Sequence, residues 1–220
     1  MAHLSLHELL RFLQQEPATY RTPIVFGVDD PKIKEDILSV LSDYRRKIFF
    51  VNPYLEKQTS SEGITLQKSQ EARLSFPVLS VGIVETSGLN FNQHSSTTAG
   101  WPGSSTAQVI RNFSGKLHLL AELHGTKEIY YYCGFAIRWG RESYQVIYIE
   151  SVTKGTLVAP QTDGAESRDT EELIALQFVP EGQEKTLGQM TPAEKQIHDP
   201  RLKALAEVLR ELEKNGLHSD

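Results

Sequence analysis

Apolar residues recur along the chain in two alternating patterns, one typical of strands and one typical of helices. Short runs rich in β-branched and aromatic residues predict strands at 24–26, 47–51, 78–84, 128–137 and 143–152, with a further strand or sheet edge at 154–160. Apolar positions three and four residues apart predict helices at 4–15, 31–45, 65–74, 108–124 (broken near Ser114), 192–198 and from 201 onward. Strands interleaved with helices, together with a hairpin signal at 139–142, predict an α/β fold with a mixed sheet.

The stretch 76–91 is the one around which the chain is organised. Residues 78–84 form a nearly unbroken apolar run, which is typical of a strand buried on both faces. Glu85-Thr-Ser-Gly88 follows at once, and we expect the chain to turn there. Polar side chains at the end of a central strand often bind a ligand or a metal. On spacing alone, an ordinary polar turn is the favoured explanation of the same residues.

A second polar segment follows the first predicted strand. Asp29 and Asp30 precede Pro31, which suits the first position of a helix. Helix N-termini attract anions, but this one is already occupied by carboxylates. The ordinary alternative is that one of the two aspartates is simply the N-cap of the helix. A polar surface loop is expected at 92–105.

Composition excludes several classes of protein. Of the 220 residues, 39% are hydrophobic and 23% are charged, and the net charge of −5 argues against a nucleic-acid-binding adaptor and against an anionic membrane partner. Cys133 is the single cysteine, so no internal disulfide is possible. Without a membrane-length apolar run or a secretory pattern, we expect a cytoplasmic protein. Zinc-ligand spacing, a Walker A motif, a dinucleotide glycine pattern and a Gly-x-Ser-x-Gly elbow are all absent from the sequence.

Ordered segments over residues 23–212 resemble the non-canonical purine nucleoside triphosphate pyrophosphatases, the inosine triphosphatase family. The segments that carry the resemblance are Val84-Glu-Thr-Ser-Gly-Leu-Asn-Phe-Asn92, Gly100-Trp-Pro-Gly103, Cys133-Gly-Phe-Ala136, Gly155-Thr-Leu-Val-Ala-Pro160 and the run 178–195. The resemblance implies an elongated mixed sheet in two lobes, with flanking helices and a central cleft. It divides the chain into an N-terminal helical extension (1–20), one α/β domain (21–216) and a tail (217–220), and it implies a homodimer.

The family hydrolyses inosine, xanthosine or deoxyinosine triphosphate to the monophosphate and pyrophosphate. In such a site carboxylates hold Mg²⁺, lysines hold phosphate, and an aromatic side chain stacks on the purine. Carried over to this chain, the resemblance gives metal ligands at Glu56 and Glu85 and catalytic positions at Glu85 and Thr86. It gives substrate-binding positions at Asp30, Lys32, Lys68, Ser87, Gly88, Lys195 and Arg201.

Much of the family pattern is missing at these positions. The family binds phosphate with the motif Thr-x-Asn-x-x-Lys, and its three named positions are Val28, Asp30 and Ile33 in this chain. The aspartate of the family motif Glu-Asp-Thr/Ser-Gly is replaced here by Thr86. The aromatic base-reading motif falls on 172–176 and is absent. Ser-His-Arg becomes Asp199-Pro-Arg201.

Two hypotheses follow from these departures. In the first, the fold persists without the chemistry, and the protein is a nucleotide-binding, regulatory or scaffold component, with a purine nucleotide or a protein as its partner and no cofactor. In the second, it is an active Mg²⁺-dependent pyrophosphatase with a rebuilt site. The number of altered positions favours the first.

Overall fold

The structure is a computed structural model, and it describes residues 24–28, 31–40, 48–51, 81–91, 101–103, 106–112, 116–139, 145–160 and 170–215. The helices predicted at 4–15 and 65–74 lie outside the described residues, so both stay predictions.

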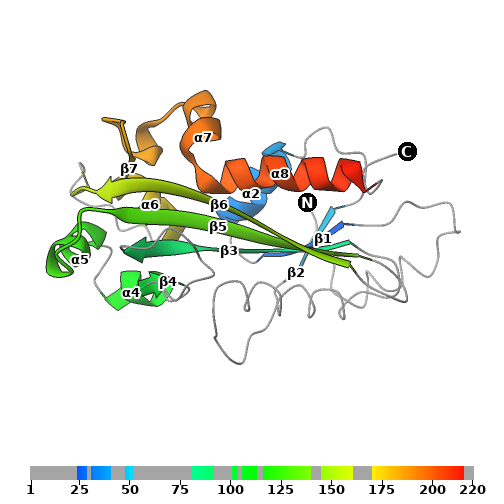
Figure 1. The fold of residues 1–220 in the computed structure, drawn as a ribbon, viewed down its shortest axis with the longest axis horizontal. Helices are drawn as coiled ribbons and strands as arrows, with labels where there is room; N and C mark the ends of the chain where they lie inside the picture. The colour runs from blue at the N-terminus through cyan, green and yellow to red at the C-terminus, as the bar shows by residue number, and fades with distance from the viewer. Residues whose placement is uncertain are drawn as a thin grey trace, which may run out of the picture.

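A mixed, seven-stranded sheet forms the centre of the molecule (Figure 1). Its order is β2 (Ile48–Val51), β1 (Ile24–Gly27), β3 (Val81–Phe91), β5 (Ile129–Trp139), β6 (Gln145–Leu157) and β7 (Phe178–Pro180), with β4 (Trp101–Gly103) paired to β3. β1 is parallel to β2 and to β3, whereas the β3–β5, β5–β6, β6–β7 and β3–β4 pairs are antiparallel. The 11 residues of β3 and of β5 make these strands about 36 Å long, so the sheet is elongated.

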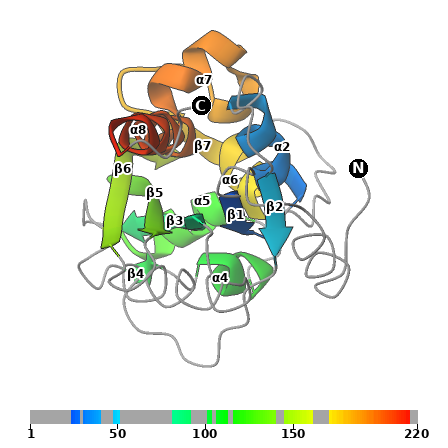
Figure 2. The same ribbon diagram turned by 90° about the vertical axis from the view of Figure 1, so that its right-hand side faces the viewer.

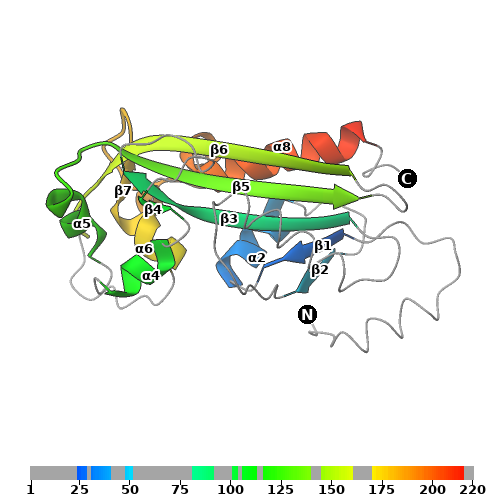
Figure 3. The same cartoon turned by 60° about the horizontal axis from the view of Figure 1, so that its bottom comes forward.

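Helices flank this sheet. They are α2 (Pro31–Val40), α4 (Thr106–Asn112), α5 (Leu117–Leu123), α6 (Thr170–Gln177), α7 (Pro192–His198) and α8 (Pro200–Lys214), with a 3₁₀ turn, η1 (Leu187–Gln189), between β7 and α7. Figure 2 shows α2, α7 and α8 on the same side of the sheet. Figure 3 shows that α4, α5 and α6 gather at one end of the long strands, while α2 lies toward the other end.

The two larger apolar cores among the described residues give the molecule its two lobes. In the first, Ile37 of α2 and Leu205 and Leu212 of α8 pack on the strands near Ile83 and Phe135. In the second, Leu120 of α5 and Ile174 of α6 pack near Leu89, Ile129 and Phe178. The long strands contribute to both cores, which confirms the predicted two-lobed architecture.

The alternating side chains of β3 locate the boundary between the cores. Residues 81, 83, 85, 87, 89 and 91 share one face of the strand because side chains alternate. Val81 and Ile83 belong to the first core, and Leu89 and Phe91 belong to the second. Glu85 and Ser87 interrupt the apolar series between them. The polar interruption therefore lies where the two lobes meet.

Several predicted boundaries were wrong. No turn occurs at 85–88, because β3 continues through these residues and pairs with β5 from Gly82 to Phe91. The strand expected at 154–160 is the end of β6, which runs without a break to Leu157. The loop expected at 92–105 contains β4, and α6 was not predicted at all. The break in the 108–124 helix, the 192–198 helix and the final helix are confirmed.

Candidate functional site

Arg201 is the centre of the polar cluster between the lobes. Asp199 caps α8 by accepting a hydrogen bond from the Arg201 backbone N–H at 2.8 Å, and Pro200 occupies the first helical position. The cap fixes the first turn of α8, and α8 packs on the sheet. As a result the Arg201 guanidinium lies inside the protein, and only 3% of its surface is exposed.

Three carboxylates from three different elements surround this guanidinium. Arg201 Nη2 lies 2.5 Å from Glu171 Oε2 and 3.7 Å from Glu85 Oε1, and Nη1 lies 3.5 Å from Asp36 Oδ2. Burial alone would lower the pKa of Arg201, but the negative charge of Glu171 and its neighbours raises it well above its usual range. Arg201 is therefore a permanent cation.

Glu171, in the first turn of α6, is the most completely bonded of these acids. It accepts a hydrogen bond from Ser87 Oγ at 2.6 Å and another from the Tyr131 hydroxyl, in addition to its contact with Arg201. Burial would raise the pKa of its carboxyl, but the Arg201 charge and these hydrogen bonds bring the pKa below its ordinary value. Glu171 is thus held ionised inside the protein.

Glu85 and Thr86, the two predicted catalytic positions, point to opposite faces of β3. The Glu85 carboxylate faces Arg201 and accepts a hydrogen bond from Cys133 Sγ at 3.3 Å. Thr86 pairs with Gly134 of β5 and lies on the face of Val84. Its buried hydroxyl has no hydrogen-bond partner among the residues that the structure describes. The two side chains therefore do not meet.

A cavity of about 420 Å³ opens beside this cluster. Its lining comes from α2, β5, α6, η1, α7 and α8, so both lobes contribute and the predicted central cleft is present. The charged residues of the lining are Asp36, Glu171, Glu172, Lys195, Asp199 and Arg201. Lys195 is half-buried, and no acidic partner contacts it within the described ranges. The cavity thus has four acids and two cations around it.

The predicted site residues separate into three groups. Ser87, Glu85 and Arg201 come together in the cluster, and Lys195 reaches the adjoining cavity. The described contacts of the cluster include none of the second group. Thr86 lies on the opposite face of β3, Gly88 pairs with Tyr132 in the sheet, and Lys32 lies on α2. Asp30, Glu56 and Lys68 fall outside the described residues. Sequence reasoning missed Glu171, Tyr131 and Asp36.

The residues that the structure describes do not by themselves fit a magnesium site. No group of three or more His, Cys, Asp or Glu side chains among them could hold a metal ion. Glu85 faces a guanidinium rather than a second carboxylate, and a nearby fixed cation opposes the binding of a divalent ion. The Mg²⁺ expected for an active enzyme therefore stays a prediction that depends on Glu56 and Asp30.

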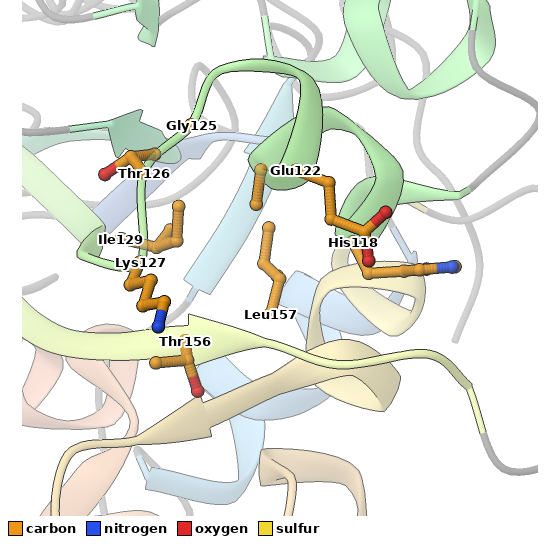
Figure 4. Close-up of a pocket in the computed structure, with 9 residues that line it drawn as sticks. His118, Glu122, Gly125, Thr126, Lys127, Ile129, Thr156 and Leu157 are labelled. Carbon is orange, nitrogen blue, oxygen red and sulfur yellow. The ribbon is translucent and has the colours of Figure 1, made fainter.

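A second cavity, of about 490 Å³, is lined in part by α5 (Figure 4), which Figure 3 shows at one end of the long strands. Ala121, Ile129 and Leu157 form its apolar wall. In Figure 4, His118 and Glu122 project from α5, while Lys127 and Thr156 extend from the segments opposite. None of the predicted site residues lines it. Among the described helices, none is long and apolar enough to span a membrane.

Comparison with known proteins agrees with this architecture. The Staphylococcus aureus Ham1 protein has 15% sequence identity and a TM-score of 0.62, covering 88% of this chain and 100% of that one. A HAM1 protein from Coxiella burnetii has 13% identity and a TM-score of 0.66, with 88% and 99% covered. A nucleoside-triphosphatase / dITP/XTP pyrophosphatase from Mycobacterium abscessus has 20% identity and a TM-score of 0.58, with 86% and 99% covered. At these identities the likeness establishes a shared fold.

The sequence itself establishes the family. The model of the Ham1 family matches residues 29–211, which is most of the 220-residue chain. The match begins and ends close to the limits of the resemblance to the inosine triphosphatases, and that resemblance is confirmed. The chain belongs to the Ham1 family.

Proposed function

We propose that this protein keeps the Ham1 fold and its interlobe cleft without the pyrophosphatase chemistry, and that it acts as a nucleotide-binding, regulatory or scaffold component. The candidate small ligand is a purine nucleotide. A homodimer or another protein partner is the candidate assembly, and the expected compartment is the cytoplasm. No metal is needed for this role.

The state of Arg201 is the observation that carries the proposal. A nucleotide-binding arginine must offer its donors to the ligand, whereas this guanidinium is already neutralised by carboxylates of the same chain. The cavity beside it has two more acids than cations among its lining residues. A triphosphate carries several negative charges, and this lining would repel it. Binding of a triphosphate in the manner of the family is therefore disfavoured.

The position of Thr86 supports the same conclusion. This residue stands where the family has an acid, and a hydroxyl cannot act as a general base at neutral pH. Thr86 is also buried on the face of β3 opposite Glu85 and Ser87. A catalytic pair of neighbouring acids cannot form from these two residues.

An active pyrophosphatase is the second candidate, and Lys195 is the observation that favours it. This lysine matches a family lysine, reaches the cavity and has no acidic partner within the described part of the chain, so it could hold a phosphate. One of the similar structures is described as a dITP/XTP pyrophosphatase. Under this hypothesis Glu56 and Glu85 hold Mg²⁺.

Pyrophosphate release from inosine, xanthosine and standard purine triphosphates with Mg²⁺, measured beside nucleotide-dependent thermal shifts, tests the proposal. We expect no turnover by the purified protein. A rise in melting temperature with nucleotide would identify a sensor or carrier, and no rise would identify a scaffold. Turnover that is lost on Glu85→Gln would establish the second candidate instead.

A further inference from the structure

The Glu171–Arg201 contact places a carboxylate of the protein on the anion-binding face of its own arginine. Both side chains line the interlobe cavity, and both are buried, at 8% and 3% exposed. A guanidinium binds carboxylates and phosphates through the same fixed set of N–H donors. A ligand anion would have to displace Glu171 to reach those donors.

Two further observations indicate that Glu171 is held in this position. Ser87 of β3 and Tyr131 of β5 both donate hydrogen bonds to its carboxylate, so both of its oxygens are bonded. Arg201 Nε, in contrast, is buried without a hydrogen-bond partner in the part of the chain that the structure describes, and Nη2 meets Glu171 Oε2 as an ion pair without a hydrogen bond of its own. The Glu171 carboxylate therefore already occupies the position beside Arg201 Nη2 that a ligand anion would take.

We propose that Glu171 is the specificity-determining residue of the interlobe cleft, because it occupies the anion-binding face of Arg201 and excludes oxo and phosphate ligands from it. The inference rests on the proposed function, since it names the residue that sets ligand choice in the same cleft. The exclusion is carried out by the Glu171 carboxylate alone and requires no metal.

The chemistry of one substitution gives a direct test. Glu171→Ala removes the –CH₂–COO⁻ group, which has the size and charge of acetate. Acetate added to this variant can refill the position opposite Arg201. In the wild-type protein Glu171 already fills that position, so acetate cannot enter it. We expect acetate, compared with chloride at equal ionic strength, to raise the melting temperature of Glu171→Ala and to leave that of the wild type unchanged.

Two controls separate this effect from a general effect of charge. Glu172→Ala removes an equal charge from the next residue of α6, which is exposed and lines the same cavity. Neither it nor the double variant Glu171→Ala/Arg201→Met should respond to acetate. An equal acetate response in wild type and Glu171→Ala, or in Glu172→Ala and Glu171→Ala, would overturn the proposal.

Glu171→Gln keeps the size of the side chain and removes its charge, so it is the variant to test if Glu171→Ala does not fold. We expect inosine monophosphate to bind this variant roughly tenfold or more tightly than it binds the wild type, and Glu172→Gln to bind like the wild type. Equal affinities of all three proteins would contradict the inference. Turnover of a triphosphate by the wild type would refute the proposed function while leaving the acetate result intact, so the two failures can be distinguished.

Discussion

Glu171 Oε2 lies 2.5 Å from Arg201 Nη2 across the boundary between the two lobes. Glu171 belongs to α6, which packs in the second core, and Arg201 belongs to α8, which packs in the first. The ion pair therefore joins the lobes as well as neutralising the cleft. Its burial decides its energetics, because removing one member of a buried pair leaves the other charged and desolvated.

Arg201→Met should lower the free energy of unfolding by about 3–5 kcal/mol, since it leaves several buried carboxylates without their cation. Urea denaturation of the purified variant measures this loss. Arg210→Met is the matched control: Arg210 lies on the same helix, is 70% exposed and pairs with Glu207. That control should change stability by no more than about 0.5 kcal/mol, because exposed pairs contribute little. Similar losses in both variants would show that the buried pair has no special role.

The stability of the protein should depend on the ionisation of Glu171 in acid. Its pKa in the folded protein is below the ordinary value of 4.5, so its ionised form stabilises the fold above that pH, and this stabilisation is lost as the pH falls through the folded-state pKa. The difference in unfolding free energy between wild type and Glu171→Gln should therefore be largest above pH 4.5 and narrow below it. Burial raises the pKa of Asp199 and the Glu171 charge raises it further, so Asp199 also contributes to this difference. The groups that face the carboxylate are Ser87, Tyr131, Arg201 and, around the arginine, Glu85 and Asp36. A difference that stays constant down to strongly acidic pH would contradict this account.

Gly155 in β6 should tolerate no side chain. A Cβ at this position would lie 2.3 Å from the Val179 carbonyl oxygen and 2.6 Å from the Phe178 ring, so β7 would have to move. Gly155→Ala should cost about 1–3 kcal/mol in urea denaturation, as overpacking does in other cores. Gly188→Ala meets nothing closer than 3.3 Å and is the milder comparison. If the Gly188 variant were the less stable of the two, the packing of β7 on β6 would need revision.

Thr191 fixes the start of α7, the helix that carries Lys195 to the cavity. Its hydroxyl accepts a hydrogen bond from the Glu194 backbone N–H. The Glu194 carboxylate in turn accepts one from the Thr191 backbone N–H, with 2.7 Å between Thr191 N and Glu194 Oε2. Thr191→Ala should cost about 1 kcal/mol, whereas Thr191→Ser keeps the hydroxyl and should cost much less. Thermal unfolding of the two variants checks this. Equal losses would mean that the methyl group, rather than the cap, matters.

How far the sequence predicts this molecule depends on the range of the interactions involved. The first part of β3 (81–84), the break between α4 and α5, and the Asp199-Pro200 start of α8 follow from local patterns, and the structure has all three. The turn expected at Glu85–Gly88 was wrong because pairing with β5, 40 and more residues away in sequence, overrides local turn preference. Glu171 was missed because nothing near it marks a site; its meaning arises only from Arg201 and Tyr131, which the fold brings to it.

A single-turnover assay with the protein in excess over inosine triphosphate and Mg²⁺ tests the central claim most directly. Such an assay detects even one catalytic event per molecule, so slow release of product cannot hide the chemistry. We expect no pyrophosphate from the wild type beyond the uncatalysed background, because Thr86 replaces the acid and Arg201 is already neutralised. Formation of one equivalent at a rate typical of enzymes, about 1 to 1,000 per second, would contradict the account and establish an active pyrophosphatase.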